Sequence, residues 1–120
     1  MALFNFGKKK TSSDPKPDAV YTYLQTENYR GFKRIKLSSY GYKPAEDGIR
    51  ALDGKDLSGS EIKVSVFLDE YPRAVVNIGK HEVGAIWKRS FDKFDAVKNG
   101  KIDAVRLEIR DGDSYLFYKV

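Results

Sequence analysis

The clearest hydrophobic pattern lies in the middle of the chain, over residues 61–87. Apolar and more polar residues alternate at its start, and this period of two predicts a strand with one buried face. The alternating apolar positions are Ile62, Val64, Val66 and Leu68. A second strand is predicted over residues 73–78 and a third over residues 82–87, because Pro72 and Gly79 interrupt the apolar runs. The three segments predict an antiparallel meander at the centre of a small sheet or barrel.

Further strands are predicted on both sides of this meander. They cover residues 19–26, 32–37, 102–110 and 114–120. Asp111-Gly112, between the last two, is the residue pair typical of a type I′ hairpin turn. The final strand is apolar on both faces, which favours a central or closing position in a sheet.

Two short helices are predicted between the strands. Pro44 suits the first position of one helix, and Ala45, Ile49 and Leu52 follow at the spacing of a single buried face. The other helix covers residues 90–98, with Ser90 as its cap and Asp92 in its first turn. Its expected buried face, which would plug the sheet, consists of Trp87, Phe91, Phe94 and Val97.

The element count predicts a mainly β fold with six or seven short strands and two short helices. Closure into a small OB-like or SH3-like barrel would remove exposed sheet edges, so we expect that architecture. An open antiparallel α+β sheet is the alternative. The chain has 120 residues, which suits one folded domain over residues 19–120.

Residues 1–18 differ from the rest of the chain in composition. Three lysines at residues 8–10 precede a segment rich in Ser, Asp and Pro, which predicts a disordered basic tail. Leu3, Phe4 and Phe6 form a small apolar tip that could dock on the domain, on a partner or on a membrane surface. The apolar residues precede the lysines, the reverse of a secretory signal, and no run approaches the ~20 apolar residues of a membrane span. We therefore expect a cytoplasmic protein without a membrane span.

Residues suited to catalysis are scarce. The chain has no Cys, and its one histidine, His81, lies at a predicted turn. Acidic pairs lie in predicted loops at Asp53 with Asp56 and at Asp69 with Glu70, where turn capping is the usual role. No phosphate-binding loop, nucleophile motif or zinc-ligand spacing is present. We expect a non-enzymatic protein that holds no cofactor or metal.

A basic and aromatic window covers residues 29–43 and contains no acidic residue. Cations for phosphates, interleaved with rings for bases, are typical of proteins that bind single-stranded nucleic acid. The candidate nucleic-acid-binding residues are Arg30, Phe32, Lys33, Arg34, Lys36, Tyr40, Tyr42 and Lys43. Strand alternation would place Arg34, Lys36 and Tyr40 on the side of Phe32. The alternative is a solvated strand face whose rings pack under loops. The net charge of +5 agrees with an anionic partner.

Parts of the chain resemble the HIRAN domain family. Residues 73–77, Arg-Ala-Val-Val-Asn, resemble the Asn-Ala-Val portion of that family's middle strand. Residues 79–86 resemble its Val-Gly-x-Ile portion, and the helix over 90–98 with Asn99-Gly100 follows in the family's order. The resemblance spans about residues 32–109.

The HIRAN resemblance implies an OB-like barrel that binds single-stranded DNA ends through aromatic and basic residues after its first strand. By motif position, Tyr40 takes the place of a base-contacting aromatic. Ser38 and Ser39 stand where DNA-binding members carry a basic residue and an aromatic, Ala85 stands where Tyr is usual, and Trp87 replaces a Pro. The Asn-Pro and Asp of the middle motif are missing. The resemblance leaves open whether the DNA-end pocket is retained.

These observations favour a non-catalytic module that binds nucleic acid, with single-stranded DNA as the expected partner. The second hypothesis is a protein-interaction module that docks through its tail or a sheet edge. The third is a small enzyme that uses the loop acids in a concave pocket. The sequence leaves the oligomeric state open.

Overall fold

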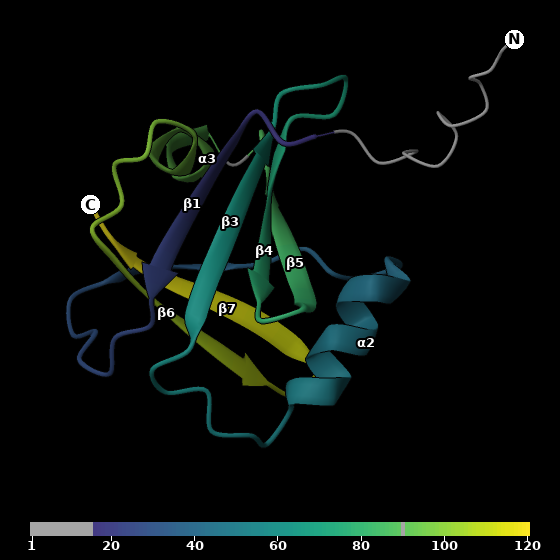
Figure 1. Ribbon diagram of the computed structural model, residues 1–120, viewed down its shortest axis with the longest axis vertical. Coiled ribbons are helices and arrows are strands. Elements are labelled where there is room, and N and C mark those ends of the chain that lie inside the picture. The colour runs from purple at the N-terminus through teal and green to yellow at the C-terminus, as the bar shows by residue number, and fades with distance from the viewer. Residues whose placement is uncertain (1–15, 90) are drawn as a thin grey trace, which may run out of the picture.

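The computed structural model describes residues 16–89 and 91–120, with the side chains of residues 91–94 excepted (Figure 1). The predictions for the tail over residues 1–15, the Ser90 cap, and the side chains of Phe91, Asp92 and Phe94 lie outside this part of the chain. Asp18, at the end of the expected tail, donates its backbone N–H to the Val66 carbonyl oxygen at 2.7 Å. Regular pairing with the sheet therefore begins just before the predicted boundary at residue 19.

The described chain forms two antiparallel sheets and two short helices, so the fold is mainly β (Figure 1). The first sheet has the order β1-β3-β4-β5 and consists of β1 (Ala19–Leu24), β3 (Glu61–Phe67), β4 (Arg73–Ile78) and β5 (His81–Trp87). The second has the order β2-β7-β6 and consists of β2 (Lys33–Lys36), β6 (Ala104–Arg110) and β7 (Asp113–Lys119). The helices are α2 (Lys43–Leu52) and α3 (Phe91–Lys98).

The predicted strands and helices are confirmed, with small changes at their ends. The central meander β3-β4-β5 pairs as expected. Asp111 and Gly112 have φ values of 55° and 81°, as a type I′ turn requires at both central positions. β7 lies between β2 and β6, which confirms the central position predicted from its two apolar faces.

The core lies between the two sheets and is built from the inward positions of the strands. Ile62, Val64 and Val66 are fully buried, as their alternation predicts. Leu68 was expected to continue this series, and that prediction is wrong because its side chain is 47% exposed. β3 ends at Phe67, and the Leu68 backbone N–H donates to Asp18 Oδ1 at 3.1 Å, so the alternation stops one residue earlier.

The expected closed barrel is not formed, and the open antiparallel alternative is closer to the structure. The two sheets are joined within the described chain by two isolated bridges, Gln25 with Val105 and Ser38 with Ala85. Each bridge lies just beyond the end of β1 or β2, where the chain leaves the ladder for a loop or turn. A continuous ladder therefore cannot extend across either junction.

Two glycines allow close approaches around β5. A Cβ on Gly84 would lie 2.7 Å from Leu37 Cβ, where the segment after β2 crosses the strand. A Cβ on Gly48 would overlap the Glu82 carbonyl oxygen, so α2 can pack on β5 only without that side chain. Ala45 and Ile49 are buried beside Gly48, which confirms the predicted apolar face of this helix.

The helices lie at different ends of the four-stranded sheet: α2 is beside β5, and α3 is at the opposite end (Figure 1). Val97 of α3 is buried in the core, as predicted for a helix that plugs the sheet. In the part of the chain that the structure describes, no helix has the length and apolar character needed to cross a membrane.

Candidate nucleic-acid interface

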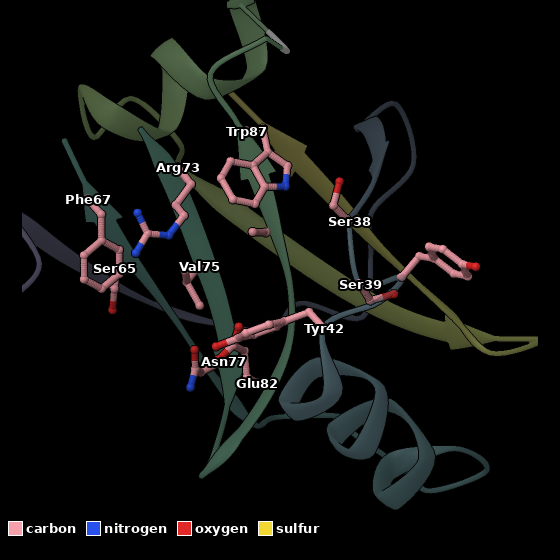
Figure 2. A pocket seen from close by; sticks show the side chains of 12 residues that line it. Ser38, Ser39, Tyr42, Ser65, Phe67, Arg73, Val75, Asn77, Glu82 and Trp87 are labelled. Atoms are coloured by element: carbon pink, nitrogen blue, oxygen red, sulfur yellow. The ribbon is translucent and has the colours of Figure 1, made fainter. Parts of the chain in front are cut away.

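A pocket of about 460 Å³ lies on the outer face of the four-stranded sheet, beside the segment that leads into α2 (Figure 2). Its floor consists of Ser65, Phe67, Arg73, Val75, Asn77, Glu82, Ala85 and Trp87, and its wall of Ser38, Ser39, Tyr40 and Tyr42. Figure 2 shows the Trp87 ring at one end and the Tyr42 ring near Asn77 and Glu82 at the other. The volume lies within the range of small-molecule sites.

Strand register determines which residues form the pocket floor. The central strand β4 aligns Phe67, Arg73 and Trp87 in one row across the sheet, and Ser65, Val75 and Ala85 in the next. These residues alternate with the buried core residues, so their side chains lie on the opposite face.

A β-bulge extends the pocket with two polar side chains. The β4–β5 register shifts between Val76 and Asn77, so Val76 is opposite Gly84 while Asn77 is opposite Glu82. The extra residue, Val83, turns into the core and is fully buried. The Glu82 side chain therefore lies on the pocket side of the sheet, whereas unbroken alternation would have directed it into the core.

Glu82 is half-buried, and this burial raises the pKa of its carboxyl group. A hydrogen bond with Tyr42 and the charge of Arg73 act in the opposite direction but do not cancel the shift. The pocket therefore holds a carboxyl group that takes up a proton more readily than an exposed glutamate.

The cation in the floor, Arg73, is already paired. Its Nη1 donates to Asp69 Oδ1 at 2.9 Å and to the Tyr71 carbonyl oxygen at 2.9 Å. Its guanidinium carbon lies 4.4 Å from the centroid of the Phe67 ring. The backbone N–H of Tyr71 and the Arg73 guanidinium hold the pKa of Asp69 below its usual value, so the pair stays ionised. This arrangement suits a flat, polar-edged ligand better than a phosphate group.

The structure separates the predicted binding residues into two groups. Arg30, Phe32, Lys33, Arg34 and Lys36 lie on β2 and the loop before it. Arg34 and Lys36 share the outer face of the β2-β7-β6 sheet, whereas Lys33 lies at a register position on the other face, opposite Tyr118. The common face predicted for these cations is therefore observed for Arg34 and Lys36.

Tyr40, Tyr42 and Lys43 form the second group, beside the pocket and at the start of α2. Tyr40 was expected to continue the face of Arg34 and Lys36. That expectation is wrong, because the chain turns at residues 40–41 and the Tyr40 side chain is 99% exposed at the pocket wall. Lys43 Nζ lies 3.0 Å from Asp47 Oδ2, an ion pair within the helix.

The loop acids act locally in turns. Asp56 Oδ1 accepts from the Ser58 backbone N–H at 3.0 Å, and Asp69 pairs with Arg73. The carboxyl group that does line the pocket, Glu82, was not among the sequence candidates. No group of three or more His, Cys, Asp or Glu side chains suited to a metal ion occurs in the described residues.

Sequence reasoning missed the pocket floor, including Phe67, Asn77 and Trp87. Phe67 and Asn77 follow an alternating pattern that also fits an ordinary solvated face. Trp87 was expected on the buried face of the second helix, and that prediction is wrong, because Trp87 is the last residue of β5 and lines the pocket on the outer face of the sheet. One signal was available: Gly84 interrupts a strand, which often marks a bulge that redirects neighbouring side chains.

Searches against protein-family models, curated proteins and solved structures found no match to this chain.

Proposed function

We propose that this domain is a non-catalytic module that binds single-stranded nucleic acid, with DNA as the expected form. The pocket would receive one base, and the exposed cations of β2 would contact the neighbouring phosphates. The observation that carries the proposal is the pocket itself: a hollow of about 460 Å³ that is lined by both aromatic rings and polar side chains.

The side chains of the pocket suit a nucleobase. Trp87 offers a flat apolar surface, and the Arg73 guanidinium on the Phe67 ring offers a second plane; a stacked base contributes roughly 1–3 kcal/mol to binding in such sites. Asn77 and Glu82 supply donors and acceptors for a base edge. Because Arg73 is neutralised by Asp69, we expect phosphates to bind outside the pocket, where Lys36 and Arg34 are exposed.

The HIRAN resemblance supports the same site. Ser38, Ser39 and Tyr40, which occupy its base-contacting region by motif position, line this pocket together with Ala85 and Trp87 from its Val-Gly-x-Ile strand. Membership of that family stays a proposal. Trp87 would supply the stacking surface that the replacements at Ser39 and Ala85 remove. The cytoplasmic location likewise stays a prediction.

The test is a fluorescence-anisotropy titration of the 120-residue chain with a labelled single-stranded oligonucleotide at low and physiological salt. Trp87→Ala should weaken binding about 5- to 100-fold, equivalent to the loss of one stacked base. Tyr71→Ala is the matched control, because Tyr71 is an exposed ring outside the pocket lining. Circular dichroism checks that both variants fold. Unchanged affinity in Trp87→Ala, or no binding of the wild type at low salt, would refute the proposal.

A protein-interaction role is the second candidate, and β1 is the observation that favours it. This strand lies at the edge of the four-stranded sheet, with Val20 48% and Leu24 65% exposed. An exposed apolar edge is a template for a strand from another chain. If it serves this purpose, Val20→Lys should abolish association in light-scattering or cross-linking measurements and leave oligonucleotide binding unchanged.

A further inference from the structure

We propose that a nucleic-acid strand held in the pocket continues across the outer face of the three-stranded sheet, on a second stacking platform centred on Tyr115 and Phe117. This inference rests on the proposed function. We call this surface the arginine–aromatic face; its cations are Arg34, Lys36, Arg106 and Arg110. It extends the binding site to a nucleic-acid strand of several nucleotides. It adds four residues of β6 and β7 to those that the sequence suggested: Arg106, Arg110, Tyr115 and Phe117.

The face is organised by strand register. β7 is the central strand, and its two rings occupy successive outward positions. Tyr115 is opposite Lys36 on one side and Glu108 on the other, while Phe117 is opposite Arg34 and Arg106. Each ring is therefore flanked by at least one cation, as in sheets on which single-stranded bases stack.

Tyr115 lies between two guanidinium groups. The guanidinium carbons of Arg34 and Arg110 lie 5.3 Å and 5.2 Å from its ring centroid. Cation–π attraction at these distances keeps the cations near the ring while their side chains stay largely exposed, with Arg110 at 54%. Guanidinium planes themselves stack on bases, so this arrangement presents both stacking surface and charge.

Phe117 is supported from the loop before β2. The Tyr29 and Phe117 ring centroids are 4.9 Å apart in an edge-to-face contact, and the Arg106 guanidinium carbon lies 4.5 Å from the Tyr29 ring. The Tyr29 hydroxyl donates to Glu108 Oε2 at 2.7 Å. These contacts fix the loop on the sheet, and Arg106, whose side chain is 24% exposed, acts as a positioning residue.

The charges of the face match a polyanion. Hydrogen bonds from Tyr29 and Arg106 lower the pKa of Glu108, so this carboxylate stays ionised and is satisfied internally. Lys36 Nζ lies 3.4 Å from Asp113 Oδ2 in an exposed pair that a phosphate can replace. Arg110 Nη2 lies 4.0 Å from Glu108 Oε1 in a long pair that a phosphate can replace, and Arg34 is exposed, so both cations favour an anionic ligand.

The pocket and the arginine–aromatic face are connected along one segment, which consists of β2 and the two residues that follow it. Ser38 lines the pocket, and Lys36 and Arg34 precede it at alternate positions on the same side of the chain. Alternate residues of a strand are roughly 7 Å apart, a spacing comparable with that of successive phosphates in an extended single strand. A nucleic-acid strand that leaves the pocket past Ser38 therefore reaches Lys36 first and then Arg34.

The experiment compares a dinucleotide with a decanucleotide of thymidine, both labelled, on the 120-residue chain. The triple variant Arg34→Ala/Lys36→Ala/Arg110→Ala should bind the decanucleotide about 10- to 100-fold more weakly and the dinucleotide as the wild type does. The slope of log Kd against log salt should fall by about 2, since three phosphate contacts are lost. Tyr115→Ala should also weaken only the decanucleotide. Lys55→Ala is the control for a general loss of positive charge, because Lys55 is an exposed lysine in the loop after α2, outside both surfaces.

The outcomes separate this inference from the proposed function. If Trp87→Ala weakens both oligonucleotides while the triple variant changes neither affinity nor salt slope, the arginine–aromatic face is refuted and the pocket stands. If the wild type binds neither oligonucleotide, both proposals fail. Polyglutamate that displaces the decanucleotide as effectively as unlabelled decanucleotide at equal charge would refute a nucleic-acid platform and indicate an acidic protein partner.

Discussion

The pocket and the arginine–aromatic face lie on different sheets and use their arginines in different ways. In the pocket, Arg73 packs on Phe67 and is neutralised by Asp69, so the floor has a cation without free positive charge. On the arginine–aromatic face, Arg34 and Arg110 also lie against a ring, but they keep much of their surface in solvent. Arginine thus forms part of a neutralised pocket floor in one region and a charged surface in the other.

The two regions also differ in shape and acidity. The pocket is concave and holds Glu82, whose burial raises its pKa. The arginine–aromatic face is an open sheet surface on which Tyr29 and Arg106 keep Glu108 ionised. A concave, weakly charged site favours one base, and an open cationic surface favours a chain of phosphates. The comparison predicts that variants can affect one region without the other.

The largest effect is expected from Gly48→Ala, which damages the pocket side alone. The new methyl group would overlap the Glu82 carbonyl oxygen, a backbone atom that no rotamer change can move. We expect a loss of about 2–4 kcal/mol in the free energy of unfolding, measured by urea denaturation, because α2 must move away from β5. The affinity for the dinucleotide, which contacts only the pocket, should fall. The additional affinity that the decanucleotide gains from the arginine–aromatic face should fall less.

Ala51→Gly is the control for this prediction, since Ala51 is exposed on the same helix and the change costs about 1 kcal/mol at most. A stability change in Gly48→Ala no larger than that of the control would show that the packing of α2 on β5 is looser than described.

Gln25→Leu tests the junction between the sheets, and its effect should be smaller. Gln25 is 5% exposed; its Nε2 donates to the Leu57 carbonyl oxygen, and its Oε1 accepts from the Leu107 N–H, each at 3.0 Å. Removal of both bonds leaves the buried Leu107 N–H unsatisfied, while the Leu57 carbonyl oxygen keeps the Ser60 N–H at 3.2 Å, and should cost about 1–3 kcal/mol in a denaturation experiment. Asn28→Ala, at an exposed position nearby, should change stability little. Equal stability of the two variants would contradict a structural role for the Gln25 side chain.

Glu82→Gln tests the electrostatic difference between the two regions through the pH dependence of folding stability. Burial raises the pKa of Glu82 in the folded state, so the folded protein binds this proton at pH values where the unfolded chain has lost it. The stability due to this group is therefore present below the unfolded pKa and is lost as pH rises through the folded pKa. The wild type should lose thermal stability relative to Glu82→Gln over that window. If the melting temperatures of the wild type and Glu82→Gln changed in parallel across this pH range, burial of Glu82 would not affect its pKa as described.

Asp113→Asn should have the smallest effect of these variants, and it should affect the arginine–aromatic face alone. It removes the exposed partner of Lys36, and such pairs contribute about 0–1 kcal/mol. We expect tighter binding of the decanucleotide by about two- to threefold in anisotropy at low salt, with no change for the dinucleotide. Asp111→Asn, in the adjacent turn, serves as a control for a general gain of positive charge. A similar gain in both variants would show that Lys36 has no specific role.

The sequence by itself determined the elements and most of the core. Period-two alternation is a local property, so the meander and its buried face at Ile62, Val64 and Val66 were predictable, as were the Asp111-Gly112 turn and the apolar face of α2. Arg34 and Lys36 share a face for the same reason.

Only the tertiary structure decided how these elements meet. The pocket combines β3, β4 and β5 with the segment before α2, and a bulge at Val83 decides that Glu82 belongs to it. The pairing of Arg73 with Asp69 and the flanking of Tyr115 by Arg34 and Arg110 bring together residues from separate turns and strands. Such contacts depend on register, bulges and chain crossing, which alternation within one segment cannot encode.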